Sequence, residues 1–444
     1  MSKFSLRKTS HILLVIMLSF VFTGCALDKA YRPNVAVACK VKPENLCSDS
    51  SIQIHNQGTG SEYSLGFVEI NDQGQFRDER KQLNALIKAL ESTPSDEPLI
   101  ISVFVHGWHH NAKEGDKNIN DFKDSLAKLA KAYTAVSKVA GIKRKVFGVY
   151  VGWRGDSIDV EYLNELTFWD RKNTAENVGQ VALSELLLRL EKVKNERNVP
   201  GSDGEGRNRL AIIGHSFGGA AVYQSTAQIM ASRFMLSGQN GDKTKTIKGI
   251  GDLVVLINPA FEAIKFAPLF DLAQAQCVYE VSQKPKLVIL TSENDGATKT
   301  LFPMGRFFST LFEKHGEVKR NDCGLPVAFG ESKADNTSVG HFEPLITHQL
   351  KLADSQSKTI SSKSLSTFKD AACKNWPAQK NGESVNFGTT DLISLGKTVE
   401  RNPYLNIRVD SEIIPNHNDI FGGALLQFIQ LTTFAATEPE CGEK

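Results

Sequence analysis

Short apolar runs alternate along the chain with longer segments in which apolar residues recur every three or four positions. The runs predict buried strands, and the spaced segments predict helices that cover them. Strands are expected at residues 64–70, 98–105, 145–151, 210–213, 252–257, 286–291 and 405–409. Helices are expected at residues 77–91 and 120–139, in a segment reaching about residue 195, at 219–231 and from 421 onward. This alternation is typical of an α/β protein with a mostly parallel sheet and helices on both faces.

The pattern loosens between about residues 301 and 402. We interpret this stretch as an insertion between the last two core strands. Within it, residues 355–366 are dense in Ser, Lys and Thr, a composition typical of a loop. An insertion at this place either covers a functional site or decorates the surface, and the pattern favours neither interpretation.

The N-terminus has a composition of its own. A basic region with Lys3, Arg7 and Lys8 precedes an apolar stretch at residues 12–22, which is too short to span a bilayer comfortably. The stretch ends in Phe22-Thr23-Gly24-Cys25 and resembles a bacterial lipoprotein signal, in which the cysteine after the small residues is lipidated. An ordinary secretory signal and an uncleaved anchor are the alternatives.

This resemblance and the composition of the segments that follow predict an organisation for the whole chain of 444 residues. Residues 1–24 would be a signal peptide, residues 25–60 a polar tether and residues 61–440 one domain. The lipid on Cys25 would hold the protein at the cell membrane, or at the outer membrane, of a bacterium. No later stretch is long and apolar enough to predict a membrane-spanning helix.

Charge excludes one class of partner. The formal net charge of +2 becomes −1 when residues 1–24 are removed, because they carry three basic residues and no acidic ones. A nearly neutral mature chain gives no electrostatic reason to expect nucleic-acid binding. Membrane association would instead come from the acyl chains.

Cysteine usage fits an exported protein. The six cysteines other than Cys25 are Cys39, Cys47, Cys277, Cys323, Cys373 and Cys441. An even number favours disulfides, although six cysteines allow 15 connectivities. We consider a local Cys39–Cys47 bridge and a Cys323–Cys373 bridge across the insertion. The chain has no Cys-x-x-Cys motif, so a redox motif or zinc ribbon is not expected.

The strongest chemical signal is Gly214-His215-Ser216-Phe217-Gly218, directly after the apolar run at residues 210–213 and before a predicted helix. A strand that turns sharply into a helix raises the serine hydroxyl above the carboxyl edge of a sheet, and small residues on either side permit the turn. We therefore interpret Ser216 as a nucleophile, with Gly214 and Gly218 supporting the turn. The amide of Phe217 would face an oxyanion.

A second segment is compatible with the same chemistry. The strand at residues 98–105 ends in His106-Gly107-Trp108. A metal site using His106, His109 and His110 is not expected, because no carboxylate or cysteine lies at the usual ligand spacing.

Together, the order of elements, the His-Gly loop and the serine turn resemble the alpha/beta-hydrolase superfamily, from about Tyr63 to Phe434. The resemblance implies that His106 and Gly107 shape an oxyanion loop and that the backbone amide of Trp108 is its second donor. It also implies a triad in the chain order serine, acid, histidine.

The acid is expected in the loop after the strand at residues 286–291. The resemblance favours Asp295, with Glu293 as the nearby competitor and Glu262 as a less favoured acid after an earlier strand. Such a carboxylate fixes the tautomer of the base and stabilises its imidazolium form.

The base should be a histidine further along the chain, which leaves His315, His341, His348 and His417. We favour His417, because it lies between the strand at residues 405–409 and the last helix. His341, inside the insertion, is the second candidate.

These residues predict a serine hydrolase of carboxylic esters that needs no cofactor and acts on a small-molecule or lipid ester. An envelope amidase or peptidase and a non-catalytic binding lipoprotein are the alternatives. The scaffold alone does not choose among them.

Overall fold

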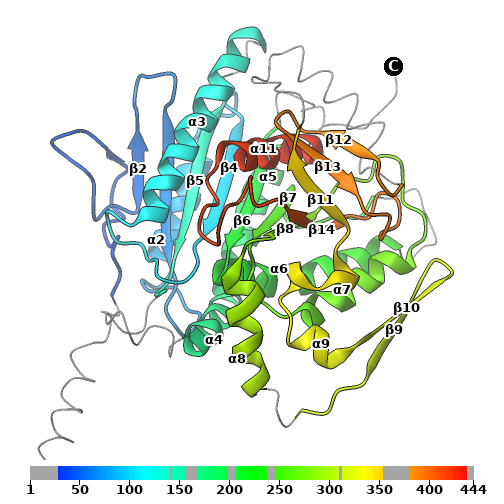
Figure 1. Ribbon diagram of the computed structural model, residues 1–444. Helices are drawn as coiled ribbons and strands as arrows, with labels where there is room; N and C mark the ends of the chain where they lie inside the picture. The colour runs from blue at the N-terminus through cyan, green and yellow to red at the C-terminus, as the bar shows by residue number, and fades with distance from the viewer. Residues whose placement is uncertain are drawn as a thin grey trace, which may run out of the picture.

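A twelve-stranded mixed sheet forms the centre of the protein (Figure 1). The computed structural model describes residues 29–140, 143–155, 168–198, 207–238, 246–309, 313–353 and 380–437. The strand order is β1-β2-β3-β5-β4-β6-β7-β8-β14-β11-β13-β12, and the strands from β3 to β11 run parallel to one another. Only the β2–β3, β11–β13 and β12–β13 pairs in this sheet are antiparallel. The predicted α/β class with a mostly parallel sheet is therefore confirmed.

Each strand predicted in the core is present to within about two residues at either end. These strands are β3 (Tyr63–Glu69), β4 (Leu99–Val105), β5 (Lys145–Gly152), β6 (Arg209–His215), β7 (Leu253–Ile257), β8 (Leu287–Ser292) and β14 (Tyr404–Val409). Nearly all their residues are buried, because helices cover both faces of the sheet. A parallel sheet brings the carboxyl ends of its strands to one edge, where a site can be built from several loops.

The helices divide between the two faces of the sheet. One face packs against α2 (Lys81–Glu91), α5 (Ala182–Arg197), α6 (Phe217–Gly238) and α7 (Ala263–Ala275). The other face packs against α3 (Lys117–Ala140) and α11 (Gly423–Thr437). The single helix predicted to reach about residue 195 is instead two, α4 (Phe168–Val178) and α5. Helix α7 was not predicted, because it is apolar on most sides and shows little helical periodicity.

Residues 29–60 join the sheet rather than forming a tether. Strand β1 (Cys39–Lys40) pairs with β2 (Ile52–His55), which pairs with β3. The segment is fastened by polar contacts: the backbone amide of Arg32 donates to Glu69, and its buried guanidinium pairs with Glu114 at 2.8 Å. Its polar composition therefore reflects buried polar contacts as well as loops. The predicted signal peptide and Cys25 lie outside the described residues.

The insertion occupies the whole segment between β8 and β14, beginning a few residues before the predicted start, and builds a second edge of the sheet. It contains η4 (Ala297–Leu301), α8 (Phe302–Ser309), the hairpin β9 (Glu317–Asp322) and β10 (Leu325–Gly330), α9 (Glu331–Asp335), η5 (Val339–His341) and η6 (Glu343–Leu345). It then adds β11 (His348–Leu352), β12 (Ser384–Asn386) and β13 (Thr390–Ser394) to the sheet. Strand β14 lies between β8 and β11 in the sheet. The last two predicted core strands, β8 and β14, are therefore neighbours in the sheet, and the insertion separates them in sequence. The predicted loop at residues 355–366 lies outside the described residues.

Within the described ranges, we find no helix with the length and apolarity needed to cross a membrane. Helix α11 is strongly apolar, but it packs against the sheet as part of the core. Its hydrophobicity is therefore used in folding.

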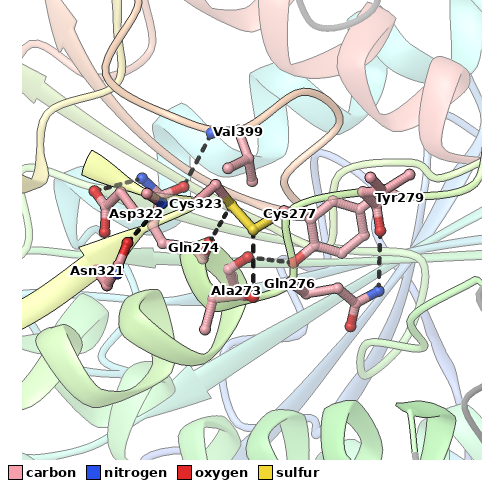
Figure 2. Close-up of a disulfide and its surroundings, with 12 residues drawn as sticks. Ala273, Gln274, Gln276, Cys277, Tyr279, Asn321, Asp322, Cys323 and Val399 are labelled. Carbon is pink, nitrogen blue, oxygen red and sulfur yellow. Dashed lines mark hydrogen bonds between the residues drawn. A yellow bond between two sulfur atoms is a disulfide. The ribbon is translucent and has the colours of Figure 1, made fainter. Parts of the chain in front are cut away.

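Two disulfides lie within the described residues. The predicted Cys39–Cys47 bridge is confirmed. Cys323 does not bond to Cys373, which lies outside the described residues; it bonds to Cys277 instead. Figure 2 shows this bridge joining the tip of the β9–β10 hairpin to the chain just after α7, beside the Gln274 side chain, which contacts Asp322 and Val399. Sequence spacing could not reveal this pairing, because it depends on the path of the insertion.

We expect loss of the Cys277–Cys323 bridge to destabilise the protein by about 2–4 kcal/mol, because the bridge closes a long loop of the unfolded chain. The measurement is chemical denaturation of a Cys277→Ser/Cys323→Ser variant. Peptide mapping without reduction provides the control on pairing. A recovered Cys323–Cys373 peptide would contradict the bridge seen here.

Candidate active site

Ser216, Asp295 and His417 meet at the carboxyl edge of the sheet, although long stretches of chain separate them. The Nε2 atom of His417 lies 2.8 Å from the Ser216 hydroxyl oxygen. Its Nδ1 atom lies 2.8 Å from Oδ1 of Asp295. A carboxylate only accepts hydrogen bonds, so Nδ1–H donates to Asp295 and Nε2 is left to accept the serine proton. The predicted histidine, rather than His341, is therefore the one beside the serine.

The backbone at Ser216 has the sharp turn that the glycines predict. Ser216 has a φ of 55°, a left-handed conformation that is uncommon for a residue with a side chain. Its amide donates to the carbonyl of Ile257, and its own carbonyl accepts the amide of Ala260. Any side chain at Gly218 would collide with the carbonyl oxygens of Val105 and His106. Strands β4, β6 and β7 thus hold the turn from both sides.

Asp295 is completely buried and surrounded by donors. Its Oδ1 atom accepts the backbone amides of Ala297 and Thr298 as well as His417, and its Oδ2 atom accepts the Thr298 hydroxyl. Burial alone would raise the pKa of Asp295, but the hydrogen bond and charge of His417 and the bonds from Thr298 lower it below the usual value. The acid is therefore held ionised and in one orientation.

The backbone of His417 is fixed by two buried side chains that the sequence analysis did not assign. Its carbonyl accepts hydrogen bonds from Nε2 of His215 and Nδ2 of Asn258, both at 2.9 Å. Burial lowers the pKa of His215 well below its usual value, so its neutral ring has one N–H, which this carbonyl accepts. His215 ends β6 and Asn258 directly follows β7, both next to the serine turn, and that position was the only signal in the sequence.

The His-Gly loop packs directly on the serine. A Cβ atom on Gly107 would lie 2.8 Å from Cβ of Ser216, so the close approach requires glycine. The amide of Trp153 donates to Nε2 of His106, which leaves Nδ1–H to donate to the Gly107 carbonyl at 2.9 Å. Because a trans peptide points its C=O and N–H in opposite directions, this bond directs the Trp108 amide away from His106.

The aromatic side chains of Trp108 and Phe217 lie close together where the His-Gly loop meets the turn at Ser216, with ring centroids 6.3 Å apart. Phe217 is buried, whereas Trp108 is partly exposed. Their amides belong to the two segments that meet at Ser216.

The competing candidates have other surroundings. Glu293 accepts a hydrogen bond from Gln349, and buried Glu262 forms ion pairs with basic residues of three helices. His341 contacts Thr298 rather than Ser216. His315 lies near Asp335, and His348 contacts the neighbouring Thr347 in the sheet.

Possible metal ligands lie apart from the three residues described above. Among the described residues, Glu313, His315 and Asp335 place ligand atoms within 4.8 Å of one another, but Arg306 already pairs with Asp335. In the His-Gly loop, His110 contacts Asp116.

The site therefore consists of a serine on a strained turn, a histidine between it and a buried carboxylate, and a glycine loop against the serine. Each part comes from a different strand end of the same sheet edge. Comparisons with protein-family models, curated proteins and solved structures give no match for this chain.

Proposed function

We propose that the protein is a serine hydrolase of carboxylic esters with an alpha/beta-hydrolase fold. The observation that carries the proposal is the continuous chain of hydrogen bonds from the Ser216 hydroxyl through His417 to buried Asp295. This chain has the geometry required to activate a hydroxyl, in which a base contacts the nucleophile and a third group orients the base. The strained φ of Ser216 and its place after a core strand support the same proposal.

In the proposed reaction, Ser216 attacks the ester carbonyl while Nε2 of His417 takes the hydroxyl proton. Ionised Asp295 stabilises the resulting imidazolium. The tetrahedral intermediate then expels the alcohol, which receives the proton from His417. Water repeats these steps on the acyl-enzyme, with His417 as the base, and releases the carboxylic acid and free Ser216.

The backbone amides of Trp108 and Phe217 are the proposed oxyanion donors. Support comes from the bond between His106 and the Gly107 carbonyl, which turns the Trp108 amide away from His106. Support also comes from the close packing of Gly107 on Ser216. Such preorganised donors typically contribute about 10²- to 10³-fold each to turnover.

The proposed substrate is an acyl ester, including lipid esters, reached from a membrane to which lipidated Cys25 anchors the enzyme. The anchor rests on the N-terminal sequence alone. The two disulfides among the described residues are compatible with export from the cytoplasm.

The proposal is tested by labelling with a fluorophosphonate probe, which reacts with activated serines. We expect the wild-type protein to be labelled and Ser216→Ala to be inert. Ser225→Ala is the matched control, because Ser225 is buried in α6 and its hydroxyl bonds to the Val222 carbonyl. Absence of labelling in the folded wild-type protein would instead favour a binding lipoprotein, and faster cleavage of anilides than of esters would favour an amidase.

A further inference from the structure

The hydrogen bonds at the candidate site continue beyond Asp295 into the insertion. The Thr298 hydroxyl contacts Oδ2 of Asp295, the carboxylate oxygen that does not face His417. On its other side, Oγ1 of Thr298 lies 3.1 Å from Nε2 of His341. Five side chains thus form one chain, which runs from His341 through Thr298, Asp295 and His417 to Ser216.

The direction of each hydrogen bond follows from the available protons. Ionised Asp295 can only accept, so the single hydroxyl proton of Thr298 is donated to it. Thr298 can then act only as an acceptor toward His341, which places a proton on Nε2 of that ring. Burial lowers the pKa of His341 to about 4, so the ring is neutral and donates through this single N–H. A single assignment of protons to Thr298 and His341 therefore satisfies all the hydrogen bonds on this side of Asp295.

The His341 end of this row of hydrogen bonds is fastened to the sheet. His341 ends the short helix η5, whose Val339 carbonyl accepts a hydrogen bond from Asn406 of β14 at 2.9 Å. A side chain at Gly340 would collide with Thr291 of β8, so η5 lies directly against the sheet. Strands β8 and β14 also precede Asp295 and His417 along the chain. The same two strands therefore position the acid, the base and His341.

We infer that Thr298 and His341 are positioning residues that hold the Asp295 carboxylate toward His417, and that this is a role of the insertion. The inference rests on the proposed function. Two backbone amides and His417 hold Oδ1, and the Thr298 hydroxyl holds Oδ2, so this hydroxyl completes the set of donors that opposes rotation about the Cβ–Cγ bond. His341 strengthens the donor, because a hydroxyl that accepts a hydrogen bond donates more strongly.

The first test removes the Thr298 hydroxyl. We expect Thr298→Val to lower kcat on a p-nitrophenyl ester by about 10- to 100-fold with little change in KM, because a misplaced catalytic group slows the reaction without altering substrate contacts. Thr298→Ser, which keeps the hydroxyl, should retain most of the activity. A kcat for Thr298→Val near that of the wild type would overturn the inference.

Thr291→Val is the matched control. Thr291 is also buried and packs against Gly340, but its hydroxyl has no hydrogen-bond partner among the described residues. Thr291→Val should leave kcat unchanged. Any loss of kcat in this variant would measure the general effect of a Thr-to-Val change where the insertion packs against the sheet. An equal loss of kcat in both variants would show a packing effect and overturn the positioning role.

The second test is a double-mutant cycle with His341→Leu. His341→Leu should lower kcat by less than Thr298→Val, and the double variant should be no slower than Thr298→Val alone, because His341 acts only through Thr298. Additive losses would overturn this order of action.

The rate of fluorophosphonate labelling, measured on the same variants, separates this inference from the proposed function. An unlabelled wild-type protein would defeat the proposed function. A labelled wild-type protein whose rate is unaffected by Thr298→Val would defeat only the inference.

Discussion

Replacing Asp295 with Asn is expected to lower kcat by about 10⁴-fold while the protein remains folded. The carboxamide has no charge to stabilise the imidazolium of His417. Whenever its NH₂ group faces Nδ1, it also favours the histidine tautomer that cannot accept the Ser216 proton. The measurement is steady-state ester hydrolysis, with circular dichroism to verify folding.

The matched control is Glu293→Gln, two residues earlier in the same loop. Glu293 contacts Gln349 and not His417, so this variant should keep its activity. The opposite result, with Glu293→Gln inactive and Asp295→Asn active, would transfer the role of the acid to Glu293. The pair therefore tests the assignment of the acid independently of the assignment of the nucleophile.

The second large effect is expected on stability, from Glu262→Gln. Glu262 is completely buried, and its carboxylate lies 2.8 Å from Nζ of Lys172, 3.2 Å from Nε of Arg306 and 3.3 Å from Nζ of Lys265. These cations come from α4, α8 and α7. Removal of the central charge takes a partner from buried Lys172 and from the more exposed Arg306 and Lys265. Breaking a buried ion pair typically costs about 3–5 kcal/mol.

We expect a loss near the lower end of that range, because the cations keep other acidic partners. Lys172 and Lys265 also pair with Glu176, and Arg306 also pairs with Asp335. The measurement is the free energy of unfolding by chemical denaturation. Glu185→Gln is the control, since its pair with exposed Arg80 is screened by solvent and should contribute little to stability. A change for Glu262→Gln as small as for Glu185→Gln would contradict the structural role.

The activity of Glu262→Gln also distinguishes a structural role of Glu262 from a catalytic one. Sequence position alone made Glu262 a possible acid, because it follows a core strand as Asp295 does. In the structure it is surrounded by basic side chains, and His417 contacts Asp295 instead. The folded fraction of Glu262→Gln should therefore hydrolyse esters at a rate close to that of the wild type.

Much of the fold could be predicted from local patterns. The core strands are apolar runs of five to eight residues that end at polar or glycine-containing turns, and each run carries its own signal. Helix α7 was missed because an apolar helix buried on several sides lacks the spacing that reveals a helix. Strands β1 and β2 were missed because strands of only two and four residues give a weak signal beside polar loops.

The candidate site was predictable where it follows the order of the strands. Ser216, Asp295 and His417 each come after a core strand, and parallel strands bring such positions to one edge. The order of residues along the chain was therefore sufficient to choose His417 over His341.

The sequence by itself determined the α/β class, the core strands, the turn at Ser216 and the three residues that meet there, because each depends on short stretches of chain and on strand order. Only the tertiary structure decided which residues support them. The contact of His341 with Thr298, the clamp of His215 and Asn258 on His417, the Cys277–Cys323 bridge and the ion pairs of Glu262 join segments distant in sequence. No local pattern encodes such contacts, because they depend on how the insertion and the strand ends pack against one another.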